Sequence, residues 1–369
     1  MTDEPDHQPS LTDMTSHDYS GLAEDDLSVA IRELISNAHE GDATAQFNLG
    51  FLYHDGKGVA HDDAVAFNWF SKAAEQEHLL AQFNVATAHF NGQGVAQDYV
   101  NAAIWYRRAA EQGLAPAQYS LGKMYADGEG VQHSDYEAAA WYRKAADQGH
   151  SGAQNSLGCL YDNGLGVPQD RVEAVKWFEL AALKGFANAQ YNLGVAYDSG
   201  EGVDQSYAEA VKWYRSAAEQ GFKPAQFNLG FAYEDGLGVS QDFAEAARWY
   251  RLAAEQGGAK SQLNLGLLYF NGKGVAKDYV EASRWLRLSA DQGMPVAQFN
   301  LAVLFEHGMG VEQDAKTALM LYNLAVINGV AGAEERRDRL AAGMSLADTA
   351  RAQAMASECM GGGYKDCGS

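Results

Sequence analysis

The chain has 369 residues, of which 47% are hydrophobic and 21% are charged, so it has ample material for a buried core. Its formal net charge of −22 makes nucleic acids and anionic membrane surfaces poor partners on electrostatic grounds. No stretch approaches the run of about 18 apolar residues that a membrane helix requires, so we expect no membrane insertion.

The N-terminal segment is acidic. Lys and Arg are absent before Arg32, whereas eight Asp and Glu residues fall within the first 26 positions. This composition predicts a disordered acidic tail over residues 1–22. The start has neither the basic region nor the apolar segment of a secretory signal. We therefore expect a cytoplasmic protein, with a periplasmic location or non-classical secretion left open.

A short helix is expected next, as an N-terminal cap over residues 23–42. The string "EDDLSVAIRELISNAHE" occupies residues 24–40, and Gly41 closes it. Beyond it the chain becomes periodic. All seven tryptophans lie 36 residues apart, at Trp69, Trp105, Trp141, Trp177, Trp213, Trp249 and Trp285. A fixed period of this size indicates a solenoid of repeated helix pairs.

Residues 117–149 illustrate one repeat. A first helix, here termed helix A, begins near Ala117, and Gly128 is expected to end it in a left-handed conformation. The second helix, helix B, is expected to begin after Ser134, with Glu137 completing a capping box. Its apolar face carries the tryptophan and several alanines. Each tryptophan is therefore predicted to pack between its own helix pair and an adjacent one.

Eight such units occupy residues 43–330, and each contains a G-x-G loop that we interpret as turn geometry. Residues 331–358 are expected to form C-terminal capping helices, with Arg336, Arg337 and Arg339 giving a polar surface. A capping box at Ser345 would open the last helix. Residues 359–369 are expected to be a flexible tail whose two cysteines, Cys359 and Cys367, either pair or remain free thiols.

The elements A-Q-x-N-L-G-x-x-Y, G-x-G-V, D-x-x-x-A-x-x-W and A-A-x-x-G recur in register, as in residues 45–76. Over residues 43–330 they resemble the Sel-one-like repeat, a 36-residue relative of the tetratricopeptide repeat (TPR). The resemblance implies an all-α, right-handed superhelical α/α solenoid of about eight TPR-like helix-turn-helix repeats with terminal capping helices. Members of this family mostly act as adaptors that hold peptides or proteins, often in bacterial envelope biogenesis, signalling or host interaction.

Enzymatic function is the alternative class. Some secreted relatives, which carry a cysteine pair in each repeat, have been described as penicillin-binding or β-lactamase-like hydrolases. This chain lacks those pairs. Ser120 and Lys123 match S-x-x-K, but no K-T-G or S-D-N motif accompanies them. The histidines show no metal-ligand spacing, and the G-x-G loops follow helices rather than strands. We therefore expect no catalytic residue, no metal site and no cofactor.

A ladder of amide side chains on helix A is the candidate peptide-binding surface. An amide offers both a donor and acceptors, so a ladder of amides can pair with the backbone of an extended peptide. The alternative is that each Asn bonds to the neighbouring repeat and fixes the superhelix. The ladder, termed the Asn ladder, consists of Asn48, Asn84, Ser120, Ser156, Asn192, Asn228, Asn264 and Asn300. A glutamine two residues before each position is predicted to form bonds between repeats.

Positions that vary between copies would give specificity. The candidates are Lys123, Asp127, Cys159, Phe231, Asp235, Leu267 and Asn271. A groove with an apolar floor and an acidic or amide rim favours peptides with aliphatic side chains and some Lys or Arg. The basic residues of helix B are interpreted as a solvated outer face.

The sequence thus predicts a monomeric, non-enzymatic scaffold or adaptor whose partner is a protein or peptide bound in a concave groove lined by helix A. A regulator of signalling or envelope biogenesis, whose acidic tail masks the groove, is a further alternative.

Overall fold

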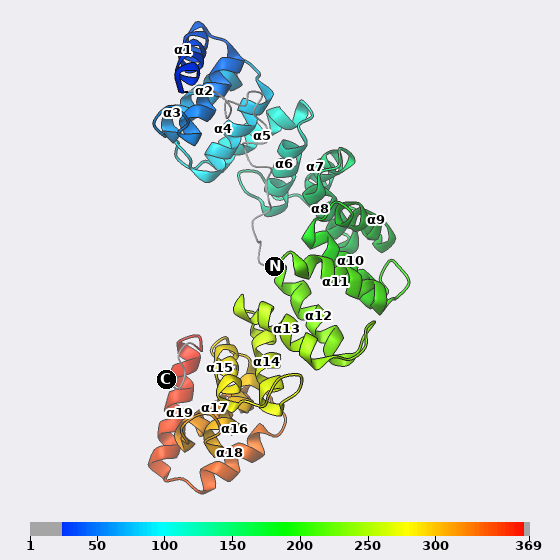
Figure 1. The fold of residues 1–369 in the computed structure, drawn as a ribbon, viewed down its shortest axis with the longest axis vertical. Coiled ribbons are helices and arrows are strands. Elements are labelled where there is room, and N and C mark those ends of the chain that lie inside the picture. Colours follow the sequence, from blue (N-terminus) through cyan, green and yellow to red (C-terminus); the bar gives the residue numbers. More distant parts are fainter. Residues whose placement is uncertain (1–23, 365–369) are drawn as a thin grey trace. The chain divides into compact units, whose positions relative to one another are not determined.

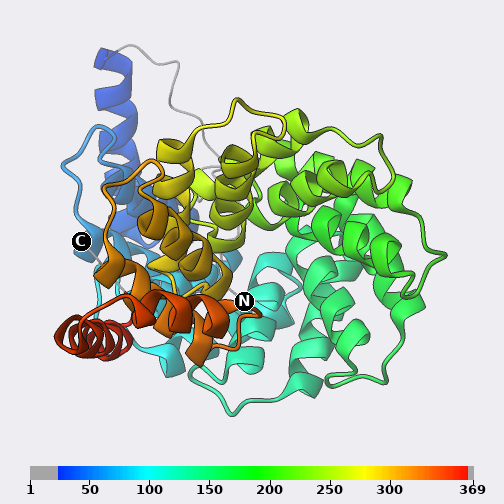
Figure 2. The same ribbon diagram turned by 90° about the horizontal axis from the view of Figure 1, so that it is seen from below.

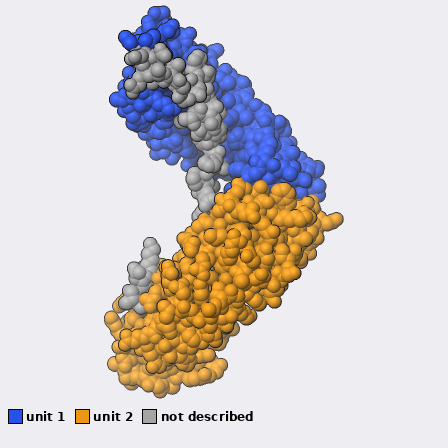
Figure 3. Space-filling view, in the orientation of Figure 1, with its two compact units in different colours: residues 1–189 blue, residues 190–369 orange. Residues whose placement is uncertain are grey.

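The computed structural model describes residues 24–364, which form nineteen α-helices and no β-strand (Figure 1). The predicted acidic tail and Cys367 lie outside these residues. Eight consecutive helix pairs make the fold an all-α solenoid, as predicted, in which helices pack mainly against their neighbours in the chain (Figure 2). The chain divides into two compact units, unit 1 with residues 1–189 and unit 2 with residues 190–369 (Figure 3).

The eight repeats, numbered 1 to 8, each contain one helix A and one helix B. Helices A are α2 (Ala43–Asp55), α4 (Leu79–Asn91), α6 (Ala115–Asp127), α8 (Ser151–Asn163), α10 (Ala187–Ser199), α12 (Lys223–Asp235), α14 (Ala259–Asn271) and α16 (Pro295–His307). Helices B are α3 (Asp63–Glu75), α5 (Tyr99–Glu111), α7 (Asp135–Asp147), α9 (Arg171–Ala182), α11 (Tyr207–Glu219), α13 (Phe243–Glu255), α15 (Tyr279–Ala290) and α17 (Ala315–Ile327). Helix α1 (Glu24–Glu40) precedes them, and α18 (Ala333–Ala342) and α19 (Leu346–Gly361) follow.

The two glycines of each G-x-G loop have different structural roles. The first ends helix A in the left-handed conformation, as at Gly128 with φ 72°. The second permits a close approach between repeats. A Cβ atom on Gly130 would lie 2.1 Å from the carbonyl oxygen of Tyr99, the first residue of helix B in the preceding repeat. The loops are therefore turns that also join repeats, in agreement with the interpretation from the sequence.

Helix B begins at the predicted cap, but only half of the capping box forms. The Ser134 hydroxyl accepts a hydrogen bond from the backbone N–H of Glu137. The N–H of Ser134 itself donates to the Tyr125 carbonyl of helix A at 2.9 Å, so the Glu137 side chain is not needed there. The equivalent glutamates Glu173 and Glu209 instead pair with lysines one turn further along helix B.

The tryptophans join consecutive repeats, as predicted. Trp141 of repeat 3 packs in one cluster with Phe83 and Tyr106 of repeat 2 and with Leu121 of its own repeat. Trp177, Trp249 and Trp285 are also buried, with exposed fractions between 4% and 8%, whereas Trp105 and Trp213 are partly buried. Removing these large apolar surfaces from water is a main source of stability in such an array.

The glutamine ladder also forms bonds between repeats, which confirms its predicted role. Gln118 of repeat 3 is buried, and its Nε2 donates to the Ala110 carbonyl of repeat 2 at 3.0 Å. Its Oε1 accepts from Gln148, at the end of its own helix B, at 2.8 Å. The buried amide of Gln118 therefore satisfies a carbonyl at the end of the preceding repeat and links the two helices of its own repeat, an arrangement in which the bond to helix B recurs in six of the eight repeats.

The basic residues of helix B are not simply a solvated face. Arg107 and Arg143 donate to the hydroxyls of Tyr125 and Tyr161, each in helix A of the next repeat. Arg215 donates to Tyr233 in the same way at 2.6 Å. These planar guanidinium groups can satisfy a hydroxyl while remaining partly hydrated, which the sequence alone did not indicate.

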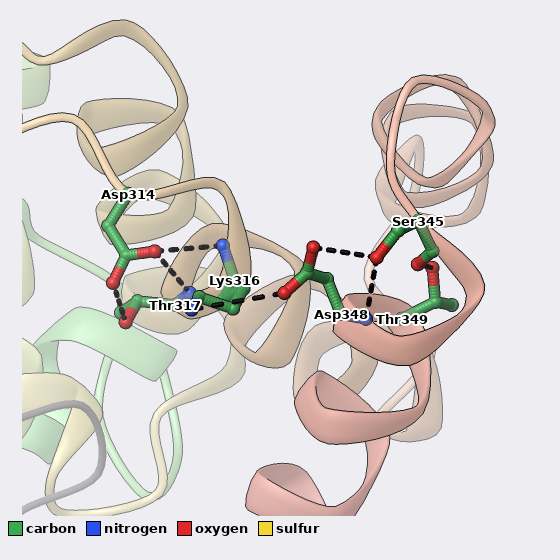
Figure 4. Close-up of polar contacts among 6 residues, drawn as sticks. All are labelled: Asp314, Lys316, Thr317, Ser345, Asp348 and Thr349. Atoms are coloured by element: carbon green, nitrogen blue, oxygen red, sulfur yellow. Dashed lines mark hydrogen bonds and ion pairs between the residues drawn. The ribbon is translucent and has the colours of Figure 1, made fainter.

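The C-terminal helices close unit 2. Arg336 of α18 pairs with Glu306 of α16 at 3.5 Å. Lys316 of α17 lies 3.9 Å from the Asp348 carboxylate of α19 (Figure 4). Helix α19 extends to Gly361, beyond its predicted end near Glu358. The reason is that Cys359 is buried with α17 in the terminal core, so this cysteine belongs to the helix rather than to a flexible tail.

Candidate functional site

Members of the Asn ladder lie at the junctions between repeats. The Asn228 side chain of repeat 6 lies beside the hydroxyls of Tyr214 and Tyr191 of repeat 5. Asn264 lies likewise beside the hydroxyl of Tyr250 of the preceding repeat, and Ser120 beside that of Tyr106. These contacts favour the alternative in which the ladder fixes neighbouring repeats.

The rest of the ladder differs from copy to copy. Asn48 and Asn84 are buried, whereas the other six members are partly buried, which leaves part of their surface accessible to a ligand. Asn300 donates to the Val296 carbonyl within its own helix. Ligand binding by the Asn ladder therefore stays a prediction.

The predicted specificity positions differ in accessibility. Phe231 is 43% exposed, an unusual exposure for a phenylalanine in an otherwise buried array. The remaining members fall into two groups: Lys123, Cys159 and Leu267 are partly buried, and Asp127, Asp235 and Asn271 are exposed. Burial raises the pKa of the Cys159 thiol to about 11, so this cysteine is a packing residue and not a reactive thiol at neutral pH.

Unit 2 contains a pocket of about 280 Å³ between repeats 5 and 6. Helices α10, α11 and α12 and the loop after α12 supply its lining, so it lies where two helices of one repeat meet helix A of the next. Two members of the predicted surface, Asn228 and Phe231, line it together. The other lining residues are Asp198, Tyr207, Ala210, Val211, Tyr214, Phe227, Ala232 and Leu237.

One carboxylate gives this pocket its charge. The Tyr214 hydroxyl donates to Asp198 Oδ2 at 3.2 Å. Burial and the nearby Asp198 carboxylate hold the pKa of Tyr214 above its usual value, so the phenol keeps its proton and remains a donor. At the rim, Gln205 Nε2 donates to the Asp198 carbonyl oxygen at 2.7 Å and to the Tyr207 hydroxyl at 3.2 Å.

Unit 1 has a counterpart of this pocket between repeats 1 and 2, but its volume is only about 20 Å³. Its lining residues stand four repeats earlier in sequence, with Asn84 and Thr87 at the positions of Asn228 and Phe231. His54 stands at the position of Asp198, and its Nδ1 lies 2.8 Å from the Asp63 carboxylate. The smaller pocket at the junction of repeats 1 and 2 thus contains an internal His–Asp pair.

Sequence reasoning found the pocket residues Asn228 and Phe231 of repeat 6 and missed those that repeat 5 contributes. The missed residues are Tyr207, Val211 and Tyr214, together with Asp198 near the end of helix A. A signal for them did exist, because positions 198 and 207 differ in chemistry from their counterparts His54 and Asp63. Only the packing of consecutive repeats, however, brings these positions to one pocket.

The Ser120–Lys123 match to a nucleophile motif receives no structural support. The Ser120 hydroxyl lies beside that of Tyr106, and burial raises the pKa of this phenol to about 12, so the phenol is no base at neutral pH. Within residues 24–364, no three His, Cys, Asp or Glu side chains are grouped to hold a metal ion. In the same part of the chain, every helix is too short or too polar to span a bilayer.

Comparison with known proteins identifies the repeat. The family model described as Sel1 repeat matches eight times, at residues 43–78, 79–114, 115–150, 151–186, 187–222, 223–258, 259–294 and 295–330. A Sel1 repeat protein from Oxalobacter formigenes is 32% identical, with 84% of this chain and 90% of that one covered and a TM-score of 0.63.

A second solved structure is that of c5321, a protective antigen of uropathogenic Escherichia coli strains that displays an SLR fold. It is 28% identical, with 90% of this chain and 94% of that one covered and a TM-score of 0.57. No curated protein matches the chain.

Proposed function

Because the chain belongs to the Sel1 repeat family, we propose that it is a non-enzymatic scaffold that holds an extended peptide segment of a partner protein. Sel1 repeats are TPR-like helical repeats, and proteins built from them generally serve protein interaction. The finer proposal is that the peptide binds to unit 2, over the junction of repeats 5 and 6.

The pocket between α10, α11 and α12 is the observation that carries this proposal. Ligand sites are typically concave and mostly apolar, with a few polar groups that fix orientation. Here the apolar lining includes Val211 and Phe227, and the polar groups are Asp198 and Asn228. Tyr207 and Phe231, 38% and 43% exposed, stand where an approaching peptide would meet them.

Aromatic anchors of this kind often dominate binding energy at protein interfaces. The Val195 side chain, 37% exposed on α10, occupies the position that Phe231 occupies on α12. Together these two side chains offer apolar surface on consecutive helices A. The partly exposed amides Asn192 and Asn228 precede them by one helical turn, so main-chain groups of a peptide would find polar partners beside its side chains.

A library of random nonapeptides displayed on phage tests this function. We expect the full chain to enrich a defined set of peptides, and Phe231→Ala to weaken the binding of those peptides by about tenfold or more. Tyr136→Ala, which removes an exposed aromatic ring from α7 in unit 1, is the matched control and should leave binding unchanged. Failure to enrich any peptide, or equal binding by Phe231→Ala, would contradict the proposal.

A further inference from the structure

We propose that the pocket between repeats 5 and 6 receives a cationic side chain of the bound peptide, a lysine or an arginine, with Asp198 as its counter-charge. This inference rests on the peptide-binding function proposed above and names the side chain that the site selects. Three observations carry it: an unpaired carboxylate, an aromatic lining and the closed counterpart in repeat 1.

The first observation is the charge of Asp198. Its carboxylate lines the pocket and accepts a hydrogen bond from the Tyr214 hydroxyl at 3.2 Å. Among residues 24–364, however, no Lys, Arg or His side chain forms an ion pair with it. At the same position of helix A, Asp162 pairs with Arg171 at 3.5 Å and Glu306 with Arg336 at 3.5 Å. In repeats 4 and 8 the protein therefore supplies a cation that it omits in repeat 5.

The second observation is the set of rings around the carboxylate. Tyr207, Tyr214, Phe227 and Phe231 all line the pocket. The face of an aromatic ring attracts an ammonium or guanidinium group, more strongly where water is excluded. Lysine and arginine also have apolar stems, which can lie against Val211 and Leu237 while the charged end reaches Asp198.

The size of the pocket agrees with such a side chain. Its volume of about 280 Å³ is several times the roughly 30 Å³ that one water molecule occupies in the liquid. A chain of methylene groups with a charged end therefore fits, with room to choose a rotamer. A purely aliphatic side chain would fit as well, but it would take the Asp198 carboxylate out of water without a counter-charge, which is costly.

The third observation is the counterpart pocket in unit 1. There His54 replaces the aspartate, and Asp63 replaces Tyr207. The two side chains bond to each other at 2.8 Å, and the remaining volume is about 20 Å³. At the junction of repeats 1 and 2, a carboxylate thus already pairs with a nitrogen-containing side chain inside the pocket. In repeat 5 the acid is present and the space for the nitrogen group is open.

The same phage library provides the test. The enriched peptides are sequenced, and the residue types at each peptide position are compared. We expect Lys or Arg to dominate one position of these peptides. Replacing that residue by norleucine in a synthetic copy should weaken binding to the wild-type protein by about tenfold, measured by fluorescence anisotropy. For Asp198→Asn, the Lys or Arg peptide and the norleucine peptide should bind within about twofold of each other.

Glu234→Gln is the matched control for charge. Glu234 stands at the position of Asp198 in repeat 6 and accepts from Tyr250 at 2.7 Å, but it does not line the pocket. Glu234→Gln removes one negative charge, as Asp198→Asn does, but it should leave the preference of the pocket for Lys or Arg unchanged. A second variant, Asp198→His with Tyr207→Asp, rebuilds the pair of repeat 1 and should abolish the preference.

The outcomes separate the two proposals. Enriched peptides without a Lys or Arg position, or a preference that survives in Asp198→Asn, would overturn the cation site and leave peptide binding standing. Equal loss of preference in Glu234→Gln would also overturn it, because the effect would then reflect net charge. If the wild-type chain enriches no peptide, both proposals fail together.

Discussion

Two buried glutamine side chains, those of Gln154 and Gln298, keep an amide oxygen without a hydrogen-bond donor. In six repeats this oxygen accepts from a glutamine at the end of helix B, as Gln226 does from Gln256 at 2.8 Å. Repeats 4 and 8 have Lys184 and Asn328 at that place instead. A buried acceptor without a donor costs free energy, so these two repeats carry a local defect.

The Lys184→Gln substitution should therefore stabilise the protein. Gln256 shows that one amide can donate both to the buried glutamine and to the glycine carbonyl of the preceding repeat, here Gly221 at 3.0 Å. The introduced amide would replace the present bond from Lys184 to the Gly149 carbonyl and also satisfy Gln154. We expect a gain of about 1 kcal/mol in the free energy of unfolding, measured by urea denaturation.

Lys184→Ala provides the control, because it removes the bond to Gly149 and gives Gln154 no donor. It should be less stable than the wild type. Equal stability of the glutamine and alanine variants would show that the orphaned oxygen of Gln154 is satisfied in another way.

The cap residue Asp314 should make stability depend on pH. Burial alone would raise the pKa of its carboxyl group, but hydrogen bonds from the Thr317 hydroxyl and from the backbone N–H groups of Thr317 and Lys316 outweigh burial and lower it (Figure 4). A carboxylate whose folded pKa is below its usual value of 3.8 adds stability above that pH. This stability is lost as the pH falls through the lowered folded value.

Asp314→Asn keeps a good cap but removes the charge. Between pH 7 and pH 3, the variant should lose less free energy of unfolding than the wild type, as measured by urea denaturation at a series of pH values. Parallel curves for the two proteins over this range would contradict the role assigned to the Asp314 carboxylate.

At the scale of the element, the two glycines of one loop should respond differently to alanine. Gly128→Ala places its Cβ 3.3 Å from His133 and forces a left-handed alanine, at a cost of about 1–2 kcal/mol. Gly130→Ala adds a clash with the Tyr99 carbonyl at 2.1 Å, which only a shift of repeat 2 against repeat 3 can relieve. We expect it to cost about 1–3 kcal/mol more. Similar unfolding free energies for the two variants would mean that the loop is not a contact between repeats.

The helices could be predicted well because their signals are local and repeated. Ser134 marks a helix start and Gly128 a helix end, and eight copies in register exclude other interpretations. The partners of individual side chains were less predictable. The Ser134 N–H bonds to Tyr125 rather than to Glu137, and Arg107 reaches Tyr125 of the next repeat, because the path of the loop and the stacking of repeats determine these distances.

The candidate site was only half predictable for the same reason. Asn228 and Phe231 stand on one face of one helix, so helical spacing alone groups them. Asp198 and Tyr207 come from a different repeat, and no periodicity within a sequence states which faces of two repeats meet. The pocket also differs in volume between junctions: it is larger at repeats 5 and 6, with Asp198 and Tyr207, than at repeats 1 and 2, with His54 and Asp63.

At the scale of the whole molecule, repetition supplies the framework, and we propose that departures from it supply the function. Tryptophans, alanines and glutamines recur in the cores and junctions, where every repeat must fit its neighbour. Variation gathers where a junction reaches solvent, as at Phe231 and Tyr207. A single framework can therefore carry different ligand preferences in different repeats without loss of stability.

The most direct test of this account is to map where a selected peptide binds, by methyl NMR of the full chain labelled at valine and leucine. We expect the largest shifts at Val211 and Leu237, which line the pocket of unit 2, and no shift at Val85 or Leu121 in the core of unit 1. Shifts confined to unit 1, or an unchanged spectrum at saturating peptide, would contradict the claim that repeats 5 and 6 hold the partner.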